Sequence, residues 1–124
     1  SAIVLNPDKN KVLLIQQYGR KDNILVAGYI SKGENAEQTL VREIKEETGL
    51  NVKDYQYMKS SYYEKTNTLM CNFICVVDSE DLSQVNEEVD KAEWFSFEEA
   101  LKNIKSKSLA EEFLIYAFKK MNYI

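Results

Sequence analysis

Apolar residues occur along this chain in short runs that are typical of β-strands, separated by polar stretches with turn-forming residues. The runs predict strands at Ala2–Leu5, Lys11–Gln17, Ile24–Ile30, Val52–Glu64, Thr68–Asp78 and Ala92–Phe97. Asn6-Pro7-Asp8 suits a tight turn, because proline favours the second turn position. The first two strands are therefore expected to form a hairpin.

A helical pattern interrupts these strands in the middle of the chain. Its apolar positions recur every four residues, at Ala36, Leu40 and Ile44. Asn35 is a suitable N-cap, and Gln38 three places later completes a capping box. Gly49 predicts the helix end, because glycine adopts the left-handed conformation at little cost.

Two further helices are predicted after the last strand. Ser96 with Glu99 offers a capping box for a short helix over Phe97–Ile104. Leu109–Lys120 has the pattern of an amphipathic helix whose terminal lysines suit the helix dipole. Because a mixed sheet packs naturally between helices, periodicity by itself predicts a one-domain α/β fold.

Composition narrows the classes of function. The 124 residues suffice for one domain with a core, so we expect residues 1–124 to form a single domain. A formal net charge of −4 argues against a general nucleic-acid binder. No apolar run approaches the roughly 20 residues of a membrane span, and we expect a cytoplasmic protein. Ser1-Ala2 leaves two explanations open, a remnant of expression or one domain cut from a longer protein.

Histidine and cysteine usage excludes several chemistries. The chain has no histidine, which rules out a Ser-His-Asp triad and a histidine-ligated zinc site. Cys71 and Cys75 lie four residues apart in a predicted strand, about 13 Å by strand geometry, too far for a mutual disulfide. They are interpreted as buried thiols in a reducing compartment.

The central helix carries acids where a core helix would carry apolar groups. Glu43 and Glu47 project beside the apolar stripe, and Glu46 lies one step around the helix. Like charges at this spacing repel, and partial burial adds a desolvation cost. One alternative is a solvated acidic face with Arg42 and Lys45 as local partners. The position of the acids at the core edge favours a bound cation instead.

Oxygen ligands suit hard divalent ions such as Mg²⁺ or Mn²⁺. Such ions clamp a diphosphate, neutralise charge on phosphorus and acidify a bound water. The implied reaction is hydrolysis of a phosphoanhydride.

The stretch Gly28–Leu50 fits the pattern Gx5Ex7REUxEExGU, where U is a bulky aliphatic residue, at every fixed position. The matching residues are Gly28, Glu34, Arg42, Glu43, Ile44, Glu46, Glu47, Gly49 and Leu50. This is the signature of the Nudix hydrolases, which the chain resembles. The resemblance implies the Nudix fold, a mixed β-sheet sandwiched between α-helices (α/β/α).

Other segments resemble the NADH pyrophosphatase branch of that family: LVAGY, EEVDKAEWFSFEEA and KSLAEEFL. That branch carries a segment SQPWPFPxS after the motif, whereas Ser60–Thr68 here is SSYYEKTNT without proline. A preference for NADH is therefore not implied by the resemblance.

The resemblance also implies roles for the acids. Glu43, Glu46 and Glu47 match metal-binding acids, and Arg42 matches the arginine that orients them. Glu88 aligns with a downstream acid that binds metal or acts as a base, and Glu87 is its competitor. The structural positions of the motif are Glu34, which anchors the preceding loop, and Gly49. A backbone carbonyl of Ala27 or Gly28 would complete the metal ligands.

Candidate substrate contacts lie outside the acids. Tyr29 occupies a position where the family often places an aromatic that stacks on a nucleobase, although a core strand residue is the alternative. Tyr62 and Tyr63 are candidates by their place after the motif, and Ala110 corresponds to a backbone contact. In the loop before Ile24, Arg20 and Lys21 are candidates for phosphate contacts or ordinary solvated cations.

The sequence hypothesis is a Mg²⁺-dependent pyrophosphohydrolase, with Mn²⁺ as an alternative ion. It would cleave a nucleoside diphosphate linked to a moiety X, either NADH/NAD-like or ADP-ribose-like, to a nucleoside monophosphate and phospho-X. The alternatives are a house-cleaning nucleoside triphosphate pyrophosphohydrolase and a non-catalytic nucleotide sensor. We expect a small-molecule nucleotide as partner, no membrane and no general nucleic acid, and leave a homodimer open.

Overall fold

A computed structural model describes residues 1–124. Its five strands form one sheet in the order β3-β4-β1-β2-β5, in which β1 and β4 are parallel and the other neighbours antiparallel. The elements are β1 (Ala2–Leu5), β2 (Lys11–Gln17), α1 (Ala36–Thr48), β3 (Val52–Tyr63), η1 (a 3-10 turn, Glu64–Thr66), β4 (Thr68–Val77), β5 (Val89–Ser96), α2 (Phe97–Asn103) and α3 (Leu109–Lys120). None of the helices is long and apolar enough to cross a membrane.

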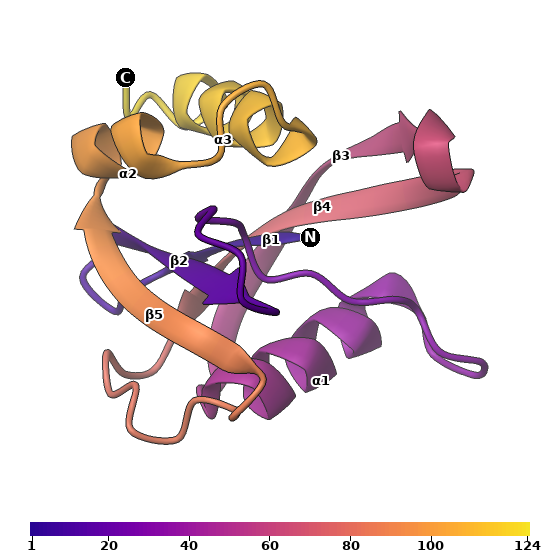
Figure 1. Ribbon diagram of the computed structural model, residues 1–124, viewed down its shortest axis with the longest axis horizontal. Coiled ribbons are helices and arrows are strands. Elements are labelled where there is room, and N and C mark those ends of the chain that lie inside the picture. Colours follow the sequence, from indigo (N-terminus) through magenta and orange to yellow (C-terminus); the bar gives the residue numbers. More distant parts are fainter.

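Helices cover both faces of the sheet, with α1 on one side and α2 and α3 on the other (Figure 1). Alternation along β1 sends its side chains into two cores, because successive residues of a strand point to opposite faces. Ala2 and Val4 pack with Leu40 and Ile44 of α1. The core on the other face contains Ile3 and Leu5 with the following residues of α2 and α3: Ala100, Phe113, Leu114, Ala117 and Phe118. The predicted α/β/α sandwich is confirmed.

Local signals placed most elements correctly. β1, β2 and α3 have the predicted bounds, and β3, β4 and α2 differ by one residue at their ends. The opening hairpin is confirmed by the antiparallel pairing of β1 with β2. β5 begins at Val89 instead of Ala92, because Val89 is buried and pairs with Gln17 of β2. At α2, Ser96 accepts a hydrogen bond from the backbone N–H of Glu99 at 3.2 Å, as expected of an N-cap.

The predicted strand over Ile24–Ile30 is wrong. The segment makes only isolated bridges, Ile24 with Ile15 and Val26 with Ala2. Leu25 and Val26 are buried on opposite faces of the sheet, which explains the strand-like pattern. Beyond Val26, residues 27–32 are exposed and no strand lies alongside them to pair. The segment thus leaves the sheet as an extended loop before α1.

The β3–β4 hairpin projects beyond the rest of the sheet and ends in η1 (Figure 1). Asn67 closes the turn in the left-handed conformation, with φ of 50°. We call residues 59–70 the hairpin arm. It lies on the same side of the molecule as the segment after Val26, and this placement creates the cavity described below (Figure 1).

Candidate active site

Helix α1 positions the motif acids and is held at both ends as its sequence predicts. The side chain of Asn35 accepts a hydrogen bond from the Gln38 N–H, and the Gln38 side chain accepts one from the Asn35 N–H, so the capping box is complete. At the other end, Gly49 has φ of 78° and donates its N–H to the Lys45 carbonyl. A Cβ at Gly49 would lie 2.5 Å from the Gln84 Cβ, so the following loop also packs closely there.

Arg42 joins the loop before α1 to the acids on the helix. Its Nε and Nη2 donate to the two oxygens of Glu34 at 2.7 and 2.9 Å, a bidentate pair. Its Nη1 donates to Glu43 Oε1 at 2.8 Å and to Glu46 Oε2 at 3.1 Å. Hydrogen bonds from Arg42 hold the pKa of Glu34 at about 2, and the pKa of Arg42 is raised in turn. This agrees with an orienting role for Arg42 and an anchoring role for Glu34.

Glu47 is the most perturbed acid of the helix. Its Oε1 accepts one hydrogen bond, from Gln17 Nε2 at 3.4 Å, while its Oε2 is buried without any partner. Burial is the largest cause of a raised pKa of Glu47, about 7; the charges of Glu43, Glu88 and Glu46 also raise this pKa, and the hydrogen bond from Gln17 lowers it. A buried, unsatisfied carboxylate oxygen costs free energy in the absence of a cation or a proton.

The loop that carries the downstream acids is bonded to the backbone of Glu47 through Asn86. The N–H of Asn86 donates to the Glu47 carbonyl at 2.8 Å, and the Asn86 side chain accepts from the Glu88 N–H at 2.8 Å. Both Glu87 and Glu88 are exposed. Of the two, Glu88 is the one whose charge raises the pKa of Glu47. The role of Glu88 or of Glu87 as the downstream acid stays a prediction.

Gly28 is needed for the approach of Glu43. A Cβ placed on Gly28 would lie 2.2 Å from Glu43 Cδ, far inside any permitted contact. The absence of a side chain lets the carboxylate of Glu43 pack against the backbone of the segment that contains Ala27 and Gly28. That juxtaposition fits a carbonyl from this segment acting together with Glu43.

The acids do not form a closed metal site as they stand. No group of three or more His, Cys, Asp or Glu side chains converges in the geometry that would hold a metal ion. Arg42 forms ion pairs with both Glu43 and Glu46. The chemistry of the donors still fits a hard cation, because the group is all carboxylate and Glu47 contains an unsatisfied buried oxygen.

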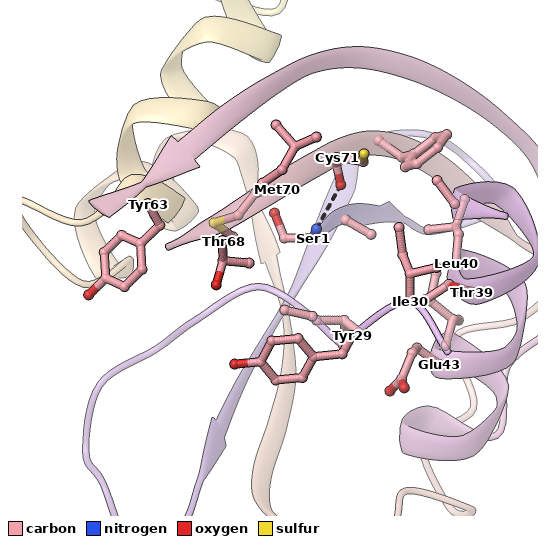
Figure 2. Close-up of a pocket in the computed structure, with 18 of the residues that line it drawn as sticks. Ser1, Tyr29, Ile30, Thr39, Leu40, Glu43, Tyr63, Thr68, Met70 and Cys71 are labelled. Atoms are coloured by element: carbon pink, nitrogen blue, oxygen red, sulfur yellow. Dashed lines mark hydrogen bonds between the residues drawn. The ribbon is translucent and has the colours of Figure 1, made fainter. Parts of the chain in front are cut away.

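A cavity of about 370 Å³ opens beside Glu43, between the first turns of α1, the segment after Val26 and the hairpin arm (Figure 2). Its lining is mainly apolar and includes Ile30, Leu40, Leu69, Met70, Cys71 and Phe73. Tyr29 and Tyr63 also line it, and their contact with a substrate stays a prediction.

Two other candidates lie elsewhere. Tyr62 does not line the cavity, and its hydroxyl donates to the side chain of Asn67. Ala110 packs against the core on the α2 and α3 side of the sheet and does not line the cavity either. The structure therefore does not bring these two residues to Tyr29 and Tyr63.

Several lining residues were missed by the sequence analysis. Cys71 and Phe73 had a signal, since strand alternation with Cys75 places them on the α1 face of the sheet. No sequence signal marked Leu69 and Met70, because their position at the cavity depends on how far the hairpin arm extends beyond the sheet. Cys71 and Cys75 are free thiols, but only Cys75 is buried as predicted, whereas Cys71 is partly exposed. Burial raises the pKa of Cys75 to about 12.

The basic loop before Ile24 is tied to β5 and to the segment that follows α2. The N–H of Gly19 donates to Asp90 Oδ2 at 2.7 Å, which ties the loop to the start of β5. Arg20 and Lys21 are exposed and form no ion pair. Neither residue lines the cavity, so their contact with a phosphate stays a prediction.

The sequence matches the family model of the NUDIX domain over residues 1–115, and the chain belongs to this family. The fold and the acid-bearing helix are thus those of a Nudix domain. Hydrolases of this family generally need divalent metal ions. The resemblance drawn from the motif is confirmed.

Among curated relatives, the NAD-capped RNA hydrolase NudC of Mannheimia succiniciproducens is 33% identical over 96 residues, 77% of this chain and 36% of that protein. NudC of Vibrio parahaemolyticus is 31% identical over 99 residues, 78% of this chain and 38% of that protein. The chain therefore spans little more than a third of the length of these relatives.

Solved structures share the fold at low sequence identity. An Ap4A hydrolase from C. elegans, solved as a binary complex, superposes with a TM-score of 0.76 at 18% identity, covering 99% of this chain and 96% of that one. The NUDIX domain of Shewanella oneidensis NrtR, solved with ADP ribose, gives a TM-score of 0.76 at 18% identity, with 97% and 84% covered. The mixed sheet between helices is thus the fold of known Nudix proteins.

Proposed function

We propose that this domain hydrolyses the diphosphate of a nucleoside diphosphate linked to a moiety X, with Mg²⁺ as the metal ion. The observation that carries the proposal is the buried, unpartnered Oε2 of Glu47, with Glu43, Glu46 and Glu88 as its charged neighbours. An apolar cavity opens directly beside Glu43 and offers a place for one end of the substrate. The products are a nucleoside monophosphate and phospho-X.

The proposed metal ligands are Glu43, Glu46, Glu47 and Glu88, with a carbonyl of Ala27 or Gly28. Bound there, Mg²⁺ supplies charge neutralisation at the diphosphate and lowers the pKa of a water. Arg42 keeps Glu43 and Glu46 oriented through its hydrogen bonds to both. Its own position is set by the bidentate pair with Glu34.

The reaction requires one water per linkage. The water oxygen forms a bond to one phosphorus while the bond from that phosphorus to the bridging oxygen breaks, and the bridging oxygen leaves with the second phosphate. A carboxylate takes up the proton that the water releases. Glu88 is the candidate acceptor, since it lies at the acidic group and is open to solvent for passing the proton on.

The similarity to NAD-capped RNA hydrolases and to an ADP-ribose-binding domain supports X groups of the dinucleotide or sugar type. A panel of NADH, ADP-ribose, dinucleoside polyphosphates, nucleotide sugars and nucleoside triphosphates with Mg²⁺, resolved by chromatography, tests this. Monophosphate products from the linked substrates are expected. If only triphosphates are cleaved and pyrophosphate is released, the domain is a triphosphate pyrophosphohydrolase. If nucleotides bind tightly but are not cleaved in Mg²⁺ or Mn²⁺, the domain is a nucleotide sensor.

The site assignment has its own test. Glu47→Gln keeps the shape of the side chain and removes its charge, and we expect kcat/KM to fall by more than the roughly 10–100-fold typical of an outer-sphere partner. Glu111→Gln on the distant helix α3 is the matched control and is expected to retain activity. Full activity in Glu47→Gln would show that the acids of α1 are not the metal ligands.

A further inference from the structure

The carboxylate of Glu47 is held from the end of β2 as well as by its own helix. Its Oε1 accepts a hydrogen bond from Gln17 Nε2 at 3.4 Å, and Gln17 is the only hydrogen-bond partner of this carboxylate. The other oxygen, Oε2, is buried and has no partner. The two oxygens of Glu47 therefore differ, because one is bonded within the protein and one is free for a ligand.

Gln17 reaches Glu47 because of its place in the alternation of β2. Ile15 packs in the core on the α1 side of the sheet, whereas Leu14 packs in the core on the α2 and α3 side. Gln17 follows Ile15 by two residues and Gln16 follows Leu14 by two, and successive residues of a strand point to opposite faces. The two neighbouring glutamines thus present the same side chain to opposite faces of the sheet.

The backbone at Gln17 is fixed by a bulge and by a tight turn. The register between β2 and β5 shifts after Gln16, so that Gln17 lies opposite Val89 and Asp90 is an extra residue of β5. Bulges of this kind re-aim side chains and are common next to active sites. Asp90 Oδ2 accepts the N–H of Gly19 at 2.7 Å, and the Gln17 carbonyl accepts a backbone N–H of the same turn at 3.1 Å. The direction of the Gln17 side chain is therefore set by an anchored backbone.

The same pair of strands also holds the main chain of Glu47. The Glu47 carbonyl accepts the N–H of Asn86 at 2.8 Å, and the Asn86 carbonyl accepts the N–H of Val89 at 2.9 Å. Val89 is the residue opposite Gln17. The backbone and the carboxylate of Glu47 are thus both tied to the place where β2 ends and β5 begins.

We propose that Gln17 is a positioning residue for the metal ion, because its amide N–H occupies Oε1 of Glu47 and leaves Oε2 as the single oxygen directed to the cation. The inference rests on the proposed function, since it takes Glu47 as a metal ligand. An amide suits this role, because it donates to a carboxylate and has no charge that competes with Mg²⁺. Outer partners of metal ligands contribute roughly 10–100-fold to metal affinity.

Binding of Mn²⁺ in the absence of substrate tests the proposal, with the electron paramagnetic resonance signal of the free ion as the readout. Gln17→Met keeps the length of the side chain and removes the donor. Because the bond at 3.4 Å is long, we expect the dissociation constant for Mn²⁺ to rise about tenfold, at the lower end of the usual range. Unchanged Mn²⁺ binding in this variant would overturn the proposal.

Gln17→Asn tests the reach of the amide. The shorter side chain keeps the donor but lacks one methylene group, so it cannot reach a partner that already lies at 3.4 Å. We expect this variant to bind Mn²⁺ as weakly as Gln17→Met does. Wild-type binding in Gln17→Asn would contradict the hydrogen bond to Glu47 as the cause.

Gln16→Met is the matched control, because it makes the same change at the neighbouring position on the other face. Gln16 Nε2 donates to the Lys21 carbonyl and to Asn23 Oδ1, both at 3.1 Å. This variant should bind Mn²⁺ as the wild type does. An equal loss in Gln16→Met and Gln17→Met would refute the positioning role, since a general loosening of the end of β2 affects both alike.

A double-mutant cycle shows whether Gln17 acts through Glu47. In the Glu47→Gln background, Gln17→Met should have little further effect on Mn²⁺ binding, because the effects of residues that act on one another are not additive. A further loss of about tenfold in that background, as large as the loss expected from an independent outer partner, would show that Gln17 acts elsewhere.

Activity separates this inference from the proposed function. With a substrate that the wild type hydrolyses, Gln17→Met is expected to need about tenfold more Mg²⁺ for half-maximal rate, while KM for the substrate at saturating Mg²⁺ changes little. If Mn²⁺ binding depends on Gln17 but the wild type cleaves no compound, the positioning role stands and the proposed hydrolysis fails. If the wild type hydrolyses its substrate and Gln17→Met binds Mn²⁺ normally, the hydrolysis stands and the positioning role fails.

Discussion

At the scale of single residues, the candidate site depends on one arginine and one glycine as much as on its acids. Arg42 bonds to Glu34, Glu43 and Glu46 at once, which sets the direction of two acids from one cation. Gly28 leaves the space that the Glu43 carboxylate occupies. Both effects are local, one electrostatic and one steric, so a single substitution can test each of them.

The Glu34–Arg42 pair is expected to make stability depend on acid pH. Because the folded protein lowers the pKa of Glu34 from 4.5 to about 2, the stabilisation is fully present above pH 4.5 and is lost as the pH falls towards 2. Glu34→Gln should therefore lower the thermal midpoint at pH 7 and flatten its dependence below pH 4.5. Circular dichroism melts between pH 2 and 7 measure this. Glu37→Gln, in the first turn of the adjoining helix α1 and without an ion pair, is the control.

Gly28→Ala should impair catalysis more than folding. The added Cβ would lie 2.2 Å from Glu43 Cδ, so the flexible side chain must move away while the surrounding structure remains. We expect a large fall in kcat/KM with a small change in thermal midpoint. Gly33→Ala is the contrast, because Gly33 has φ of 86° and an added Cβ meets no atom within 4 Å. That substitution should cost about 1–2 kcal/mol of stability and retain activity.

At the scale of elements, α1 is the part of the fold that its own sequence specifies most fully. Its capping box, its apolar stripe and its terminal glycine all act within a few residues. β5 and the segment 24–30 behave differently, because the bounds of a strand depend on the neighbour with which it pairs. β5 begins earlier than predicted because β2 extends beside it. Segment 24–30 is not a strand because no strand pairs with residues 27–30.

Gly49→Ala tests the end of α1. Alanine in the left-handed conformation costs about 1–2 kcal/mol, and its Cβ would crowd Gln84 at 2.5 Å. Urea unfolding should show a lower midpoint with an unchanged slope. Activity is expected to fall as well, because the crowded loop leads to Asn86, which bonds to the Glu47 carbonyl. Lower stability with unchanged activity would show that this loop does not influence the proposed site.

At the scale of the whole molecule, the site collects residues from both ends of the domain. Gln17 of β2 donates to Glu47 of α1, and the charge of Glu88, just before β5, raises the pKa of Glu47, because β2 pairs with β5 over its full length. The cavity is likewise shared by α1 and the hairpin arm. Binding at such a place stabilises the fold as a unit, since the ligands are brought together only in the folded state.

A divalent ion is therefore expected to raise the thermal midpoint of the domain. At a concentration of about 100 times the dissociation constant, the linkage contributes roughly 2.7 kcal/mol. Differential scanning calorimetry in EDTA and in Mg²⁺ measures the shift. Glu47→Gln should show little shift and, without metal, should be at least as stable as the wild type, because it removes a buried charge with an unpartnered oxygen. An equal Mg²⁺ shift in this variant would place the ion elsewhere.

The sequence by itself determined the helix that carries the acids, the sandwich architecture and the family, because these depend on short-range spacing, capping and a motif within Gly28–Leu50. Only the tertiary structure decided that the charge of Glu88 acts on Glu47, that one oxygen of Glu47 is buried unpartnered, and that Tyr63 and Tyr62 differ in their access to the cavity. These features depend on long-range strand pairing and on the reach of the hairpin arm. Burial and proximity across a sheet are properties of the assembled fold, which no local pattern of residues contains.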